Sequence, residues 1–281
     1  MRRLTGWQQV LCQLGLAAIA LFVLAPIWGV VYLAFDASIK GAPTAFRLWP
    51  EQFTLSIFRE VWSHSQRVPP FLHLLRNSLM VSGSAAFLSV ALGASMAYAF
   101  ARYRFPGRRA GLFGLLLGAL LPPVAFMVPL YVLLSAIGIR TSLLGLAVVY
   151  ASFSMPFCVW NMRAAFQSVS RELEESALLD GATSWTAFWR VTLPLALPAV
   201  AVAALIAFLI GYSEFAMGWL FVESSQNVTV AMAISGMVGG GIESWSYLAA
   251  LAILMSLPVV LIFLLLQRHL LDRMLFGSVG D

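Results

Sequence analysis

Long apolar stretches alternate with short segments that carry most of the charges along this chain. Each stretch is about 20 residues or longer, and about 20 residues of helix span the roughly 30 Å of a bilayer core. Because backbone polar groups find no water in hydrocarbon, such stretches cross the membrane as helices. The pattern predicts six transmembrane helices, at residues 11–35, 77–100, 110–136, 142–164, 194–218 and 245–267.

The composition agrees with this prediction. Of the 281 residues, 61% are hydrophobic and 10% are charged, and the mean hydropathy is +0.89. Soluble domains carry about 25% charged residues, so a water-soluble fold is excluded. We expect an all-α membrane protein with one transmembrane domain over residues 1–281 and a core at 75–267. An external loop is expected at 36–76 and a cytoplasmic loop at 165–193.

The basic residues predict the orientation of the chain. Eleven of the 17 Lys and Arg residues, with the cluster Arg102–Arg109 foremost, fall on one side of the predicted spans. Basic loops face the cytoplasm, so both termini are predicted to be cytoplasmic. This distribution also explains the net charge of +5 without a nucleic-acid partner. The six basic residues on the other side are Lys40, Arg47, Arg59, Arg67, Arg76 and Arg140.

The first apolar stretch, Leu11–Phe35, follows two arginines and so resembles a secretory signal. It is about 25 residues long, however, whereas the apolar part of a signal peptide has roughly 7–15. We therefore expect it to remain in the protein as the first transmembrane helix.

The cytoplasmic loop contains signals for two short helices. Ser170 suits the N-cap of a helix that has acidic residues in its first turns. Gly181 suits the left-handed residue that ends such a helix. A second helix is predicted over Ser184–Arg190, and Pro194 is expected to begin the next span.

This pair of helices suits insertion into a cleft on another protein. Small residues permit close approach, and the carboxylates of Glu175 and Asp180 offer charge-assisted contacts to Arg or Lys. Aromatic side chains would anchor the pair to the bundle. The alternative is a connector that lies on the lipid headgroups, although an anionic helix fits an anionic leaflet poorly.

The loop resembles the EAA motif of ABC importer permeases, in the carbohydrate-type form found in maltose-permease-like subunits. Segments 97–108, 129–131, 138–141 and 156–163 resemble the same family, so the similarity covers most of residues 75–260. Ser176 stands where alanine is usual and Ser170 where proline is common, and the tail 277–281 is only loosely similar. The motif residues are Glu175, Ser176, Ala177, Asp180, Gly181, Ala182, Phe188, Leu193 and Pro194.

The resemblance implies the type I ABC importer permease fold and a bacterial inner-membrane location. It also implies a heterodimer with a second permease subunit, two ATP-binding subunits and an extracytoplasmic substrate-binding protein. ATP and Mg would be bound by the ATPase subunits, because this chain has no phosphate-binding GxxxxGK[ST] motif and no cofactor site of its own. A sugar, an oligosaccharide or a glycerol-phosphate-like polyol would fit as cargo.

A few polar and aromatic residues are candidates for the substrate pathway. Glu214 lies at the end of the fifth predicted span, and an ionisable group at membrane depth suggests function. The alternative is a carboxylate that reaches the interface or pairs within the bundle. The other candidates are Tyr212, Tyr131, Asn77, Asn161 and Trp219.

Two other classes of membrane protein remain as alternatives. A secondary transporter would bury ion-coupling charges in mid-span, whereas Glu214 lies near an end. A membrane enzyme would need a convergent catalytic set, such as HExxH or a Ser/His pair. Cys12, Cys158 and the three histidines have no metal-ligand spacing, so no metal site is expected.

Overall fold

The computed structural model describes residues 5–39, 41–43, 47–63, 69–239 and 244–276. The described residues form helices joined by turns and loops, with one isolated β-bridge between Asp36 and Phe53. The chain divides into two compact units, residues 1–71 with 234–257 and residues 72–233 with 258–281. Lys40, Arg67 and the tail 277–281, which entered the sequence analysis, lie outside the described residues.

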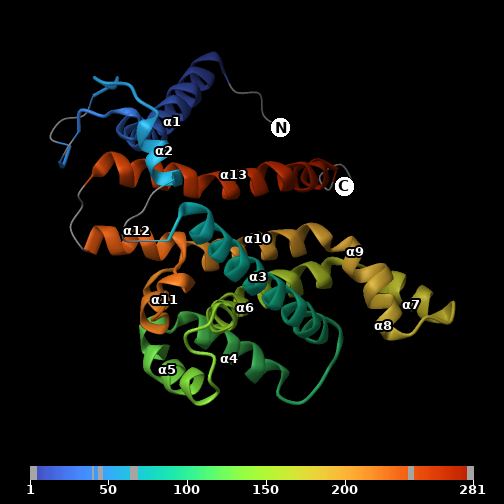
Figure 1. The fold of residues 1–281 in the computed structure, drawn as a ribbon. Coiled ribbons are helices and arrows are strands. Elements are labelled where there is room, and N and C mark those ends of the chain that lie inside the picture. The colour runs from blue at the N-terminus through green and yellow to red at the C-terminus, as the bar shows by residue number, and fades with distance from the viewer. Residues whose placement is uncertain (1–4, 40, 44–46, 64–68, 240–243, 277–281) are drawn as a thin grey trace. The chain divides into compact units, whose positions relative to one another are not determined.

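The predicted all-helical membrane fold is confirmed. Among the described residues, four helices are long and apolar enough to cross a bilayer, and two bent helix pairs bring the number to six if each pair is one span. The four are α1 (Gly6–Phe35), α3 (Phe71–Arg102), α6 (Leu143–Ser168) and Trp245–Gln267 within α13 (Trp245–Phe276). Figure 1 shows these helices along the chain.

The third predicted span, 110–136, is not one straight helix. Helix α4 (Arg108–Leu120) ends before Pro122. The next segment, Pro123–Ala136, consists of the 3₁₀ turn η1 (Pro123–Phe126) and α5 (Met127–Ala136) and lies at an angle of 103° to α4. Two consecutive prolines lack backbone N–H donors, and each disfavours the helical conformation of the residue before it. Leu121 and Pro122 are accordingly extended.

The fifth predicted span, 194–218, is also wrong at both ends. Helix α10 runs from Leu197 to Ser213, and a shorter helical segment precedes it at an angle of 78°. Proline in the first turn of α10 is therefore Pro198 rather than Pro194. After α10 the backbone of Glu214 is extended, and α11 (Ala216–Phe221) follows.

The core of the second unit is built around α6. Tyr150, Met162 and Phe166 on this helix are fully buried. Small residues bring the neighbouring helices close, because a Cβ added at Gly211 of α10 would lie 3.3 Å from the Cα of Ser82 in α3. Beyond α11, the turn η3 (Ser225–Asn227) leads into α12 (Val230–Gly239).

The first unit is organised around the buried carboxylate of Asp36, which follows α1. This carboxylate accepts hydrogen bonds from the backbone N–H groups of Ser38, Glu51 and Gln52 and from the Ser38 hydroxyl. The hydroxyl of Ser246 donates to the Asp36 carbonyl at 2.9 Å. Burial tends to raise the pKa of Asp36, but these hydrogen bonds outweigh it and leave the pKa below its usual value. The carboxylate therefore fixes the start of the predicted external loop.

Candidate functional site

The first helix of the predicted docking loop forms where its signals place it. Helix α7 covers Arg171–Leu179, and the Ser170 hydroxyl accepts a hydrogen bond from the backbone N–H of Glu172. Gly181 has φ +88°, in the left-handed region. The N–H of Gly181 donates to the Leu178 carbonyl and that of Ala182 to the Ala177 carbonyl, which is the Schellman pattern of helix termination.

The motif residues of α7 and its terminal turn lie mostly on an exposed surface. Glu175, Ser176, Asp180 and Gly181 are exposed, and Leu179 beside them is 89% exposed. Within the described part of the chain, neither Glu175 nor Asp180 forms an ion pair. We call this set of five residues the α7 tip. It combines small residues, two unpaired carboxylates and an exposed leucine.

The second short helix of the loop has an α-helical and a π-helical part. Helix α8 (Ser184–Ala187) continues into the π-helix η2 (Phe188–Thr192) and then α9 (Leu193–Leu195). The N–H of Leu193 donates to the Phe188 carbonyl, five residues earlier. Because Pro194 has no N–H and its ring crowds the carbonyl four residues before it, a wider turn is favoured at this point.

Phe188 is the aromatic residue that anchors the loop to the transmembrane helices. It is buried, with its ring centroid 4.7 Å from that of Tyr98 in α3 and 5.9 Å from that of Phe166 in α6. Trp185 and Trp189 contact Phe188 and each other but remain exposed. The expected anchoring by aromatic residues is thus concentrated in one side chain.

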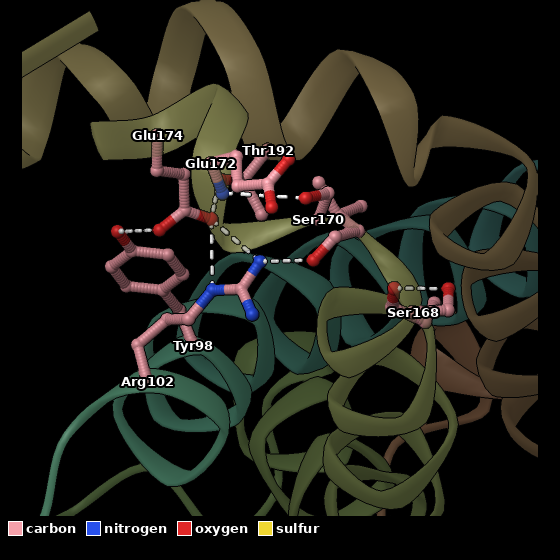
Figure 2. Close-up of polar contacts among 9 residues, drawn as sticks. Tyr98, Arg102, Ser168, Ser170, Glu172, Glu174 and Thr192 are labelled. Atoms are coloured by element: carbon pink, nitrogen blue, oxygen red, sulfur yellow. Dashed lines mark hydrogen bonds and ion pairs between the residues drawn. The ribbon is translucent and has the colours of Figure 1, made fainter. Parts of the chain in front are cut away.

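A buried carboxylate on α7 joins the loop to the ends of three other elements. Figure 2 shows Glu174 facing Arg102 at the last turn of α3, with the Arg102 Nε donating to Oε1 at 2.8 Å. The Thr192 hydroxyl of η2 donates to the same oxygen, and the Tyr98 hydroxyl donates to Oε2. The Arg102 guanidinium also donates to the Val169 carbonyl, directly after α6, at 2.9 Å.

The pair is shielded from water, since the side chains of Arg102 and Glu174 are 8% and 11% exposed. The sequence pattern does not reveal this pair, because Glu172, Glu174 and Glu175 all suit the first turns of a solvated helix. One available signal was the spacing of Tyr98 and Arg102, which places both on one face of a helix at its polar end. Such a pair at a helix end indicates an acidic partner.

The pathway candidates from the sequence occupy different surroundings. Tyr212 is buried and stacks on Phe208 at 5.3 Å. Asn161 lies in α6, where its side-chain oxygen is buried and lacks a hydrogen-bond partner among the described residues. Glu214 accepts a hydrogen bond from the Met217 N–H through Oε1, while its Oε2 is buried with no such partner in the described chain.

Two of the other three candidates bind backbone carbonyls beyond α11, and the third contacts an arginine. Asn77 is buried and donates from Nδ2 to the carbonyls of Gln226 and Val228. Trp219 donates from its indole to the Met232 carbonyl at 3.1 Å. Tyr131 lies under the Arg140 guanidinium, 4.6 Å from ring centroid to Cζ.

Arg140 in turn pairs with Glu223 at 2.5 Å, and this hydrogen bond raises the pKa of Arg140. Asn227 donates to the Thr141 carbonyl at 2.7 Å. Polar groups of α3 and of the turn between α5 and α6 therefore fasten residues 222–229 from two sides.

Comparisons with known proteins extend over most of the chain. Residues 89–276 match the family model described as "Binding-protein-dependent transport system inner membrane component". The chain is 36% identical to the maltose/maltodextrin transport system permease protein MalG of Salmonella typhimurium and of Escherichia coli K12. These matches extend over 218 residues, 75% of this chain and 74% of each relative.

Solved structures show the same fold at lower sequence identity. A chain of a bacterial ABC transporter that imports the acidic polysaccharide alginate is 20% identical, with a TM-score of 0.75 over 95% of this chain and 99% of that one. A chain of the MetNI methionine ABC transporter in an inward-facing conformation is 19% identical, with a TM-score of 0.58 over 72% of this chain and 95% of the other.

Proposed function

This chain belongs to the family of binding-protein-dependent transport system inner membrane components, and we propose that it carries a sugar or oligosaccharide and couples to its ATPase through Glu175–Pro194. It is a multi-pass inner-membrane permease subunit of an ABC importer. ATP hydrolysis in such importers belongs to separate ATPase subunits, and a periplasmic binding protein completes the complex. Permeases of this family typically bind no cofactor.

The observation that carries the coupling proposal is the geometry of the α7 tip. Glu175 and Asp180 are exposed and unpaired, on a helix that ends in a tight turn at Gly181. Small residues around that turn let a partner surface approach the backbone, and unpaired carboxylates favour a partner with Arg or Lys in its cleft. We infer that the α7 tip inserts into an ATPase subunit, which is the subunit that binds ATP and Mg.

Movement of the ATPase subunits would then reach the membrane through the loop. The loop continues through η2 and α9 into α10, so a displacement of α7 acts directly on this span. Short rigid helices transmit rigid-body motion between packed domains. We propose that residues 1–281 act as one transmembrane domain that alternates between inward-facing and outward-facing states. In this proposal, loop 165–193 receives the movement of the ATPase subunits.

The relatives support a carbohydrate cargo. MalG belongs to a maltose/maltodextrin system, and the alginate transporter is known in complex with an alginate pentasaccharide-bound periplasmic protein. We propose a corresponding complex here, with a second permease subunit, two ATP-binding subunits and an external binding protein. Glu214, Tyr212 and Asn161 remain candidates for the pathway, together with Tyr131, Asn77 and Trp219.

The coupling proposal is tested by purifying the chain in complex with its ATPase subunit. Glu175→Lys reverses an exposed charge, and Gly181→Asp adds a charged side chain where a partner would approach the backbone, so both should reduce ATPase retention and ATP hydrolysis by the complex. Glu60→Lys reverses an exposed glutamate on α2 (Ser56–Ser63) and is the matched control. Undiminished retention and hydrolysis in both α7 variants would refute the coupling proposal.

A further inference from the structure

The buried pair of Arg102 and Glu174 lies behind the α7 tip. Glu174 is on α7, one residue before Glu175, yet its side chain is 11% exposed whereas Glu175 is exposed. Its carboxylate is directed toward the ends of the transmembrane helices, as Figure 2 shows. Two adjacent acids of α7 therefore face different surroundings: Glu175 faces outward, and Glu174 faces the helix bundle.

Contacts of this buried pair connect four elements. Arg102 lies at the end of α3 and donates both to Glu174 and to the Val169 carbonyl at the end of α6. Thr192, which donates to Glu174, lies in η2, and η2 leads through α9 to α10. A second contact between α3 and α6 comes from Arg163 of α6, whose Nε donates to the Phe100 carbonyl of α3 at 3.4 Å.

We propose that Arg102 and Glu174 are positioning residues of coupling, a rigid joint that makes α7 and the end of α3 move as one body. The joint rests on the proposed docking of the α7 tip but is separate from it, because neither side chain lies on the exposed surface. Without the joint, α7 would still present Glu175 and Asp180 to a partner, but its movement would no longer be passed fully to α3.

Physical chemistry favours a positioning role over a purely stabilising one. A buried ion pair seldom stabilises a fold more than well-packed apolar residues of the same volume, because both charges lose water. The advantage of such a pair is that it fixes a relative orientation, because a planar guanidinium binds a carboxylate in only a few geometries. Thr192 adds a third directional contact from a π-helix, a rare conformation often found at functional sites.

The test uses the full chain in complex with its ATPase subunits in lipid nanodiscs. Spin labels are attached to cysteines introduced at Glu172 on α7 and Ser95 on α3, both exposed, after Cys12 and Cys158 are replaced by serine. Distances between the labels are measured without nucleotide and after trapping with ATP and vanadate. A rigid joint predicts one narrow distribution that is the same in both states.

Three variants then test the pair, and a fourth, Thr192→Val, is held in reserve. Glu174→Gln and Arg102→Gln should each broaden the distribution, because one buried charge loses its partner, while ATPase retention stays within about twofold of the parent. The double variant Arg102→Glu with Glu174→Arg should restore a narrow distribution, since it reinstates the pair in reverse. Thr192→Val keeps the ion pair and removes only the Thr192 hydrogen bond. It replaces a single variant that fails to accumulate, and its distance distribution should have an intermediate width.

Different results separate the joint from the docking proposal. The joint is overturned if the parent protein itself changes its α7–α3 distance between the two nucleotide states. It is also overturned if the single variants keep the narrow distribution, or if a well-folded reversed pair stays as broad as the singles. Docking fails instead if Glu175→Lys and Gly181→Asp both leave ATPase retention and hydrolysis undiminished, whatever the label distances show.

Discussion

Ala182 donates its backbone N–H to the carbonyl of Ala177 at 3.0 Å, and this bond closes α7. It forms because Gly181 between them has φ +88°. No atom lies within 4 Å of a Cβ built at Gly181, so a larger residue there would be resisted by backbone strain rather than by a clash. The shape of the α7 tip therefore depends on the conformation of one residue.

Substitution at this glycine should follow left-handed propensity rather than size. Gly181→Ala should destabilise the turn by about 1–2 kcal/mol, because alanine disfavours the left-handed region. Gly181→Asn should cost less, since asparagine tolerates that region. Hydrogen exchange at the Ala182 amide measures the effect, and equal exchange rates in the two variants would contradict it.

Two acids near the start of α7, Glu172 and Glu174, should differ sharply in their contribution to stability. Glu174→Ala leaves Arg102 buried without its partner and should lower the free energy of unfolding by about 3–5 kcal/mol. Glu172→Ala alters an exposed side chain and should change it by less than about 0.5 kcal/mol. Thermal unfolding of the detergent-purified chain provides the comparison. Similar losses in both variants would show that burial of Glu174 does not matter.

Asp36 gives the first unit a predictable dependence on pH. Its pKa in the folded chain lies below the ordinary value of 3.8, so the ionised form is favoured by folding. The resulting stability is fully present above pH 3.8 and is lost as pH falls through the lower, folded pKa. Hydrogen exchange at the Gln52 amide should accelerate in that acidic range.

Asp36→Asn provides the control for this pH dependence. The amide keeps one acceptor oxygen but turns an N–H₂ group toward backbone donors, which should cost about 1–3 kcal/mol at any pH. The acid-induced acceleration at Gln52 should then disappear. If exchange at Gln52 in Asp36→Asn still accelerated in acid as in the parent, the pH dependence would have to come from a group other than Asp36.

Asn77 offers a way to separate a pathway residue from a structural one. It donates to the carbonyls of Gln226 and Val228, so Asn77→Leu leaves both acceptors without this partner and should cost about 1–3 kcal/mol. Faster proteolysis within residues 222–229, measured on the purified chain, is the expected sign. Unchanged proteolysis combined with reduced uptake would instead favour a direct role in the pathway.

Sequence alone predicted much of this fold because bilayer length and helix ends leave strong local signals. The apolar stretches marked the spans, and Ser170 and Gly181 marked the two ends of α7. Bends were harder to predict. Pro122 and Pro123 announce a break, but the 103° angle depends on how α4 and α5 pack. The end of α10 at Ser213 was missed because apolar residues continue beyond Glu214.

The buried pair could not be predicted for a different reason. Burial of one acid among Glu172, Glu174 and Glu175 is decided by a contact between residues 72 positions apart. Helical periodicity places Glu174 on another face from its neighbours, but it does not reveal which face meets the bundle. The packing of Phe188 against Tyr98 and Phe166 settles that orientation in the structure.

Direct contact between the α7 tip and an ATPase subunit is best tested by photo-cross-linking. A benzophenone amino acid replaces Leu179, an exposed apolar residue beside Asp180, and in a control it replaces Leu55, an exposed apolar residue of the first unit. Illumination of the assembled complex should join the ATPase subunit to the chain from position 179 and not from position 55. Cross-linking from position 55 alone, or from neither position in a complex that still hydrolyses ATP, would contradict docking through α7.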